Sequence, residues 1–113
     1  MKFAALIALV AVLAVPAALA ATPTLNGTVG PGFTITLTQG GKKVTKLKAG
    51  TYTFKISDKS NLHNFHLTGP GVDKKTSVTG QGSSTWKLTL KKGTYKFVCD
   101  PHKSFMKGSF TVS

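Results

Sequence analysis

The sequence contains no arginine and no glutamate, and only one cysteine, one tryptophan and two methionines among its 113 residues. Its basic residues are 15 lysines, which oppose three acidic residues, Asp58, Asp73 and Asp100, so that the net charge is +12. Proteins that read nucleic acids usually rely on arginine and on clustered basic patches. Here the lysines are instead spread along the predicted strands at alternating positions. We therefore expect no nucleic-acid partner, and instead acidic partners that the positive field attracts.

The N-terminal segment, residues 1–20, has the features of a secretory signal peptide. One lysine precedes a continuous apolar run, and Ala18 and Ala20 occupy the small-residue positions that a signal peptidase reads. The run breaks at Pro16, which fits a retained membrane anchor poorly. We predict cleavage after Ala20, export to the periplasm, cell surface or extracellular space, and a single mature domain of residues 21–113 without a membrane span.

The single cysteine is unusual for a small exported domain, because such domains commonly gain stability from disulfide bonds. Cys99 has no partner within the chain. Three interpretations are open from this fact alone: a buried side chain without a role, a disulfide with another molecule, or a metal ligand.

Six segments of the mature chain alternate apolar and polar residues, which is the pattern of a half-buried β-strand. Turns rich in glycine and proline separate them, and no segment has a helical period. Short strands at this spacing predict an all-β domain, a Greek-key sandwich of two sheets. The six predicted strands are residues 33–38, 51–57, 63–68, 84–90, 93–99 and 108–112.

The alternation also predicts which side chains face the core. Cys99 shares a face with the two aromatic residues of its segment, and His63 shares a face with Phe65. Both therefore point inward at the end of an apolar strand. His66 lies on the opposite face, where we expect a structural role with a hydrogen bond across the strand. Trp86 is expected to pack in the core.

A cysteine, a histidine and a methionine occur on one short loop, at Cys99, His102 and Met106, and His63 can add a second imidazole. Each of these side chains taken singly fits an ordinary core or loop position. Two histidines, one cysteine and a weak axial methionine together form the ligand set of blue-copper electron-transfer sites. Zinc prefers more thiolates or carboxylates in a closed tetrahedron. The set therefore predicts one copper ion per chain.

At these residues the sequence resembles the cupredoxins, the plastocyanin, pseudoazurin and amicyanin group of small exported type 1 blue-copper proteins. The resemblance is sharpest in two segments, LHNF at residues 62–65 and YKFVCDPHKSFMKGSFTV at residues 95–112. The second segment contains the Tyr, Cys, Pro, His, Met and Gly order of the family's ligand loop. The spacing between its Cys and Met lies between the amicyanin and plastocyanin spacings, so it does not define the length of the axial bond.

The resemblance implies a ligand set and two neighbouring residues. Asn64 would tie the two ligand-bearing segments together, as the family's asparagine does. Asp100 follows the cysteine, where plastocyanins carry a small hydroxyl residue, and its carboxylate would favour the more positive oxidised copper. The acidic docking patches of plant plastocyanins are absent here. The implied copper ligands are His63, Cys99, His102 and Met106.

These features predict a monomeric electron carrier and not an enzyme, because copper enzymes need further copper centres or an open coordination position. His102 is expected to lie nearest the surface, inside an apolar rim. A redox protein with an acidic patch would dock there. An exported copper carrier or storage protein and a metal-free structural sandwich remain alternatives. The predicted rim is Pro101, Phe105 and Met106, and the predicted docking residues are Lys103, Phe105 and Lys107.

Overall fold

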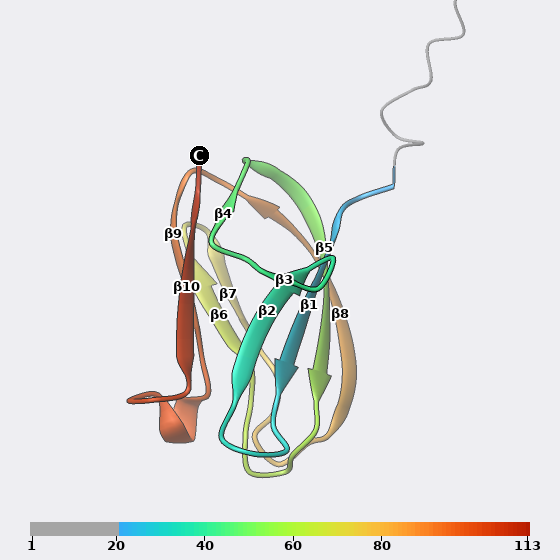
Figure 1. Cartoon of the computed structure of the whole chain (residues 1–113), viewed down its shortest axis with the longest axis vertical. Coiled ribbons are helices and arrows are strands. Elements are labelled where there is room, and N and C mark those ends of the chain that lie inside the picture. Colours follow the sequence, from blue (N-terminus) through green and yellow to red (C-terminus); the bar gives the residue numbers. More distant parts are fainter. Residues whose placement is uncertain (1–20) are drawn as a thin grey trace, which may run out of the picture.

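The chain folds into two β-sheets that pack face to face, as shown in the computed structural model, which describes residues 21–113 (Figure 1). This arrangement confirms the predicted all-β sandwich. The predicted signal peptide, residues 1–20, lies outside the described residues. Within residues 21–113, no helix has the length and apolar character needed to cross a membrane.

The first sheet has five strands in the order β3-β2-β1-β5-β8. Strands β1 and β5 run parallel, and the other neighbouring pairs are antiparallel. The chain leaves this sheet for the other one and returns to it more than once, which is why strands distant in sequence become neighbours. The strands are β1 (Thr24–Val29), β2 (Ile35–Gln39), β3 (Lys42–Lys43), β5 (Gly50–Asp58) and β8 (Gly82–Leu90).

The second sheet also has five strands, in the order β4-β10-β9-β6-β7. Strand β10 is parallel to β4 and antiparallel to β9, and β6 lies between β9 and β7. A short 3-10 turn, η2 (Asp100–His102), follows β9. The strands are β4 (Lys46–Leu47), β6 (His66–Gly69), β7 (Val72–Lys75), β9 (Gly93–Val98) and β10 (Lys107–Val112).

Two predicted strands begin later than the alternation indicated. The predicted strand at residues 63–68 begins only at His66, and the one at residues 33–38 begins at Ile35. In the first case the backbone of Phe65 bonds to the loop after β7: its N–H donates to Thr76 Oγ1 over 2.9 Å, and its carbonyl accepts from Thr76 N over 3.0 Å. His63 therefore lies on a loop before the sheet.

The core fills the space between the sheets and is built largely from aromatic and branched side chains. Two pairs of rings stack almost parallel: Phe65 on Phe97 with centroids 5.4 Å apart, and Tyr95 on Phe110 at 5.2 Å. Trp86 is partly buried and packs against this core, as predicted. The first stack matters for function, because Phe65 and Phe97 lie on the two segments that also carry His63 and Cys99.

Candidate metal centre

A short loop carries the chain from β5 to His63. The Asp58 carboxylate accepts from Ser60 N over 3.0 Å, and the Ser60 hydroxyl accepts from Leu62 N, also over 3.0 Å. These are successive side-chain turns, which fix a short loop without a helix or a strand. They leave His63 only 2 % exposed, so its imidazole is held within the protein.

The second ligand-bearing segment is a closed loop between β9 and β10. Its ends are joined because Cys99 N donates to the carbonyl of Met106 over 3.0 Å. Inside it, the carbonyl of His102 accepts from Met106 N over 2.8 Å, and His102 N donates to the carbonyl of Cys99 over 3.0 Å. Pro101 lies in the first turn of η2, where its missing N–H is not needed. Three candidate ligands therefore share one small rigid loop.

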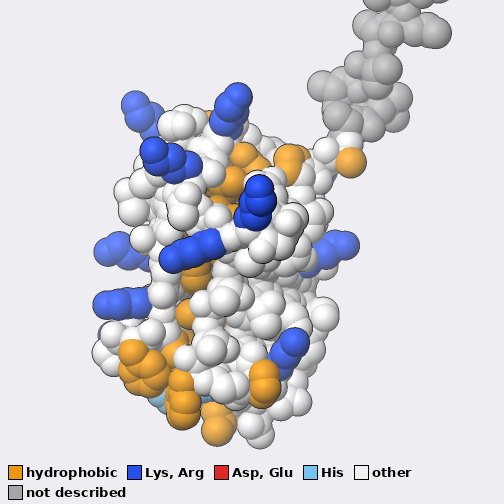
Figure 2. All heavy atoms as spheres, in the orientation of Figure 1, with side chains coloured by type: hydrophobic (Ala, Val, Ile, Leu, Met, Phe, Trp, Pro, Cys, Tyr) orange, Lys and Arg blue, Asp and Glu red, His pale blue; other side chains and the backbone are white. Residues whose placement is uncertain are grey.

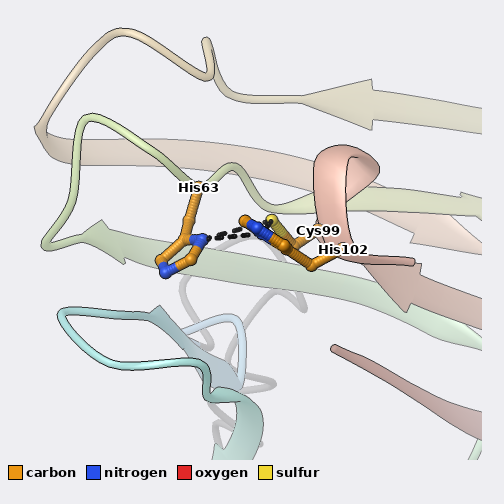
Figure 3. Close-up of side chains that lie close together, drawn as sticks. All are labelled: His63, Cys99 and His102. Carbon is orange, nitrogen blue, oxygen red and sulfur yellow. Dashed lines mark hydrogen bonds between the residues drawn. The ribbon is translucent and has the colours of Figure 1, made fainter. Parts of the chain in front are cut away.

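The two loops bring His63, Cys99 and His102 to one point, where both imidazole rings and the sulfur face one another (Figure 3). The two Nδ1 atoms are 3.1 Å apart, and each lies 3.6 Å from Cys99 Sγ. The point equidistant from these three atoms lies about 2.0 Å from each, within the range of about 2.0 to 2.3 Å for imidazole and thiolate ligands of a transition metal. The triangle therefore has the size of a metal site.

The donor chemistry fits a metal better than a set of hydrogen bonds. Two imidazole Nδ1 atoms and a sulfur all present lone pairs to the same small volume, and only protons placed between them could satisfy three mutual contacts. One metal ion satisfies all three at once. Two nitrogens and one thiolate in a trigonal arrangement are the equatorial donors that suit copper.

Met106 is 1 % exposed, so the prediction that it forms part of an exposed rim is wrong. The hydrogen bonds that close the loop hold its backbone next to Cys99 and His102, and its side chain is buried as a consequence. His102 is partly exposed, whereas His63 is buried, so His102 is the imidazole nearer the surface, as expected.

Asn64 and Asp100 join the two loops. Asn64 Nδ2 donates to Asp100 Oδ2 over 2.8 Å, and Asp100 N donates to Asn64 Oδ1 over 2.7 Å. Burial by itself raises the pKa of Asp100, but hydrogen bonds from His66 and Asn64 outweigh it and hold the pKa below its ordinary value. The carboxylate is therefore ionised and fixed, and does not point freely into water.

The turn after β1 approaches the centre from the other sheet. Gly30 has a φ of +73°, and a Cβ placed there would lie 3.0 Å from Ser60 Cβ and 3.3 Å from Cδ2 of His63. Glycine is therefore needed for conformation and for space. Burial raises the pKa of the nearby Asp58, whose Oδ2 has no hydrogen-bond partner among the described residues.

Phe33 belongs to the site, although the sequence pattern placed it in a strand. Its ring is 65 % exposed and lies edge-on to both imidazoles, with centroids 5.4 Å from His63 and 5.2 Å from His102. It also contacts Phe105, at 5.8 Å. The position of this phenylalanine directly after the VGPG turn was the available signal, but nothing in the sequence connected it to the ligand loop.

Comparison with known protein families identifies this architecture. The family model described as "Cupredoxin-like domain" matches residues 3–112. The chain is a member of the cupredoxin-like family. The predicted resemblance is thereby confirmed, and the two-sheet sandwich is this family's domain. No curated protein matches the chain in full-sequence comparison.

Solved structures similar to this cupredoxin-like chain include several of rusticyanin. A structure described as the copper protein rusticyanin has 17 % identity and a TM-score of 0.60, with 80 % of this chain and 76 % of the other covered. A reduced rusticyanin has 20 % identity and a TM-score of 0.57, with 80 % and 78 % covered. Rusticyanin from Thiobacillus ferrooxidans has 22 % identity and a TM-score of 0.54, with 80 % and 76 % covered. At these identities the likeness establishes the fold.

Proposed function

We propose that this cupredoxin-like chain is a mononuclear type 1 copper protein that carries single electrons. The observation that carries the proposal is the triangle of His63 Nδ1, His102 Nδ1 and Cys99 Sγ, whose centre has the size of a transition-metal ion. Met106, buried on the same loop, is the proposed axial ligand. The solved rusticyanin, described as a copper protein, supports the choice of metal.

The arrangement of the residues suits electron transfer. Copper, when bound, supplies a one-electron couple. The two hydrogen-bonded loops hold the donor atoms in one geometry, so little rearrangement accompanies a change of charge. His63 and Cys99 are buried and exclude water, whereas His102 reaches the surface between apolar side chains and offers the shortest exit for an electron. His63, Cys99, His102 and Met106 would supply four protein ligands to the metal, so we propose a carrier and not an enzyme.

We further propose that residues 1–20 are removed on export and that residues 21–113 act in the periplasm, at the cell surface or outside the cell. The apolar run followed by small residues at Ala18 and Ala20 supports this assignment. Edman sequencing of the protein purified from a secreting host tests it, with Ala21 expected as the first residue.

Addition of Cu(II) to the purified protein tests the proposed function. We expect one equivalent to bind and to give the intense visible band of a copper–thiolate bond. Cyclic voltammetry should then show a reversible one-electron couple. A copper store would instead release its metal readily to a competing chelator, because a storage site must be exchangeable. A colourless complex, or a coloured one without reversible reduction, would contradict an electron carrier.

Replacing the two nearby histidines should have opposite results. His63→Ala removes a proposed ligand and should bleach or shift the visible band, whereas His66→Ala should leave the band nearly unchanged, because His66 lies on the outer face of β6. Absorption spectra of the two copper-loaded variants, recorded at equal copper and protein concentrations, make the comparison. If His66→Ala removed the band and His63→Ala retained it, the ligand assignment would be wrong.

An apolar patch surrounds the exit at His102. Phe33, Leu62 and Phe105 are 65, 66 and 58 % exposed, and we call these three residues the apolar rim. Pro101 is exposed beside them. In Figure 2 hydrophobic side chains gather at this end of the molecule, with a histidine visible between them. Contiguous exposed apolar surface commonly marks a docking site, and we propose that a redox partner docks here.

Lysines should steer that partner to the rim. Lys103 and Lys107 are exposed next to His102 and Met106, and the face in Figure 2 carries lysines with no visible carboxylate among its described residues. The double variant Lys103→Glu with Lys107→Glu should slow electron exchange with an acidic redox protein by about tenfold at low salt. Stopped-flow rates at increasing ionic strength should converge as the screening length falls to about 8 Å.

The control for this experiment must lie away from the rim. Lys42 and Lys43 are distant in sequence, but Lys43 lines the same groove as Lys107 and is therefore unsuitable. Lys91→Glu with Lys92→Glu is the matched control, because these lysines lie at the β8–β9 turn, at the end of β9 opposite Cys99. Equal slowing by both double variants would mean that only total charge matters.

A further inference from the structure

His66 lies between two carboxylates on the outer face of the second sheet. Its Nδ1 is 2.8 Å from Asp100 Oδ1, and its Nε2 is 2.6 Å from Asp73 Oδ1. The chain has only three acidic residues and a net charge of +12, and two of the three meet on this one imidazole. A solvated histidine without a structural role would not be expected to contact two of the three carboxylates of the chain.

Both contacts require the imidazole to carry two protons. An ionised carboxylate can only accept hydrogen bonds, so each ring nitrogen of His66 must donate. An imidazole with protons on both nitrogens is an imidazolium. The direction of the pKa agrees: burial by itself lowers the pKa of His66, but hydrogen bonds to Asp100 and Asp73 outweigh it and raise the pKa above its ordinary value.

The imidazolium is connected to both ligand-bearing loops. Asp100, which follows Cys99, binds His66 through Oδ1 and Asn64 through Oδ2. Asn64 follows His63, and its Oδ1 accepts a hydrogen bond from Asp100 N. One continuous set of hydrogen bonds therefore runs from Asp73 on β7, through His66, to the residues adjacent to two proposed ligands.

The other charged groups that face His66 are lysines. Lys75 is its register partner on β7, and Lys107 lies on the same row across β9, because Val98 pairs with both Lys107 and His66. Lys96 lies on the same face of β9, one row further along. These positive charges oppose protonation of His66, so the state of the ring depends on its two carboxylate partners.

We propose that His66 is a positioning residue for the metal centre: held as an imidazolium between Asp73 and Asp100, it fixes the carboxylate beside Cys99 and makes the reduction potential depend on pH. The inference rests on the proposed function. While His66 is protonated, its positive charge offsets that of Asp100. Once the proton is lost, the uncompensated carboxylate favours the more positive oxidised centre, so the potential falls as pH rises through the titration of His66.

NMR of the histidine ring nitrogens and electrode potentials test the proposal together. In the purified diamagnetic protein, metal-free and loaded with Cu(I), we expect His66 to carry both ring protons at neutral pH and to lose one at a pH above about 6.5. Across the same pH range, the equilibrium constant for reduction of the copper protein should fall about threefold, which is about 28 mV for a one-electron couple.

Two variants identify the responsible group. His66→Gln retains a polar side chain but cannot be charged, so its potential should not show the step that the unsubstituted protein shows over that range. Asp73→Asn removes one partner and should move the step to lower pH. The visible band should remain in both variants, because none of the substituted residues is a proposed ligand.

Three results would overturn the proposal. One is a His66 ring that titrates at or below about 6.5. Another is a pair of parallel potential curves for the unsubstituted protein and His66→Gln. The third, absence of the blue band in the unsubstituted protein, would overturn the proposed function and with it the effect on potential, and the NMR titration of the metal-free protein distinguishes that failure from failure of the histidine bridge.

Discussion

Cys99→Ala is expected to abolish the visible absorption of the copper-loaded protein. The band arises from charge transfer between the thiolate and the metal, and the chain has no second cysteine to replace it. Loss of a direct ligand should also weaken copper binding by more than the roughly 10- to 100-fold typical of losing a group that only orients a ligand. Absorption spectroscopy and a competitive chelator titration measure the two effects.

Cys99→Ser provides a comparison, because it preserves the size of the side chain and replaces the soft donor by a hard one. It should bind copper weakly and without the intense band. Circular dichroism should show both variants folded, since Cys99 is a small buried residue whose loss leaves the stacked rings of the core in place. A band that survives Cys99→Ala would exclude a copper–thiolate centre.

Among the substitutions proposed for this protein, Phe65→Ala should cause the largest loss of stability. Phe65 is fully buried, stacks on Phe97 and packs against Trp86 at 6.3 Å, so truncation leaves a cavity between the sheets. Such substitutions cost roughly 3 to 5 kcal/mol. For a domain of this size that corresponds to a fall in Tm of roughly 12 °C or more. Thermal unfolding of the metal-free protein measures it without a contribution from bound metal.

Phe33→Ala is the matched control. The same side chain is removed, but from an exposed position, and stability should change by only about 0.5 kcal/mol. Electron exchange with a docked partner should slow nonetheless, because Phe33 belongs to the apolar rim. If Phe33→Ala were as destabilising as Phe65→Ala, the ring would be part of the core and not of a docking surface.

The sheets were predictable where one face of a strand is buried and the other is solvated. Strands β5, β9 and β10 keep a strict alternation, and their predicted positions agree with the structure to within a few residues. Strands β3 and β4 have two residues each, too few for any period to show. Strand β1 was missed although its burial alternates, because Gly27 occupies an inward position without an apolar side chain and the Asn26–Gly27 pair is a turn signal.

The site was predictable to the extent that its residues are close in sequence. Cys99, His102 and Met106 share one loop, so their clustering was visible, and the asparagine after His63 linked the second segment to the family pattern. Tertiary contacts decided the remainder. His63 is held by side-chain turns and not by a strand, Phe33 arrives from the other sheet, and Asp100 meets His66 through the pairing of β6 with β9.

The ends of the described domain lie away from the metal centre. Ser113 pairs with the backbone next to β4, donating to Leu47 O and accepting from Ala49 N, at the end of β10 opposite the ligand loop. In Figure 1 the C-terminus is at the top and η2 is at the bottom, and the described chain also enters from the top.

A tether beyond Ser113 would therefore leave the apolar rim uncovered. Protein anchored to a bead through a C-terminal tag should still exchange electrons with a soluble partner. Anchoring through Lys103 would bury the rim against the support and block that exchange. Attachment of the domain to a larger assembly through either end is thus compatible with its proposed role, because the length of the β-sandwich separates the point of attachment from the apolar rim.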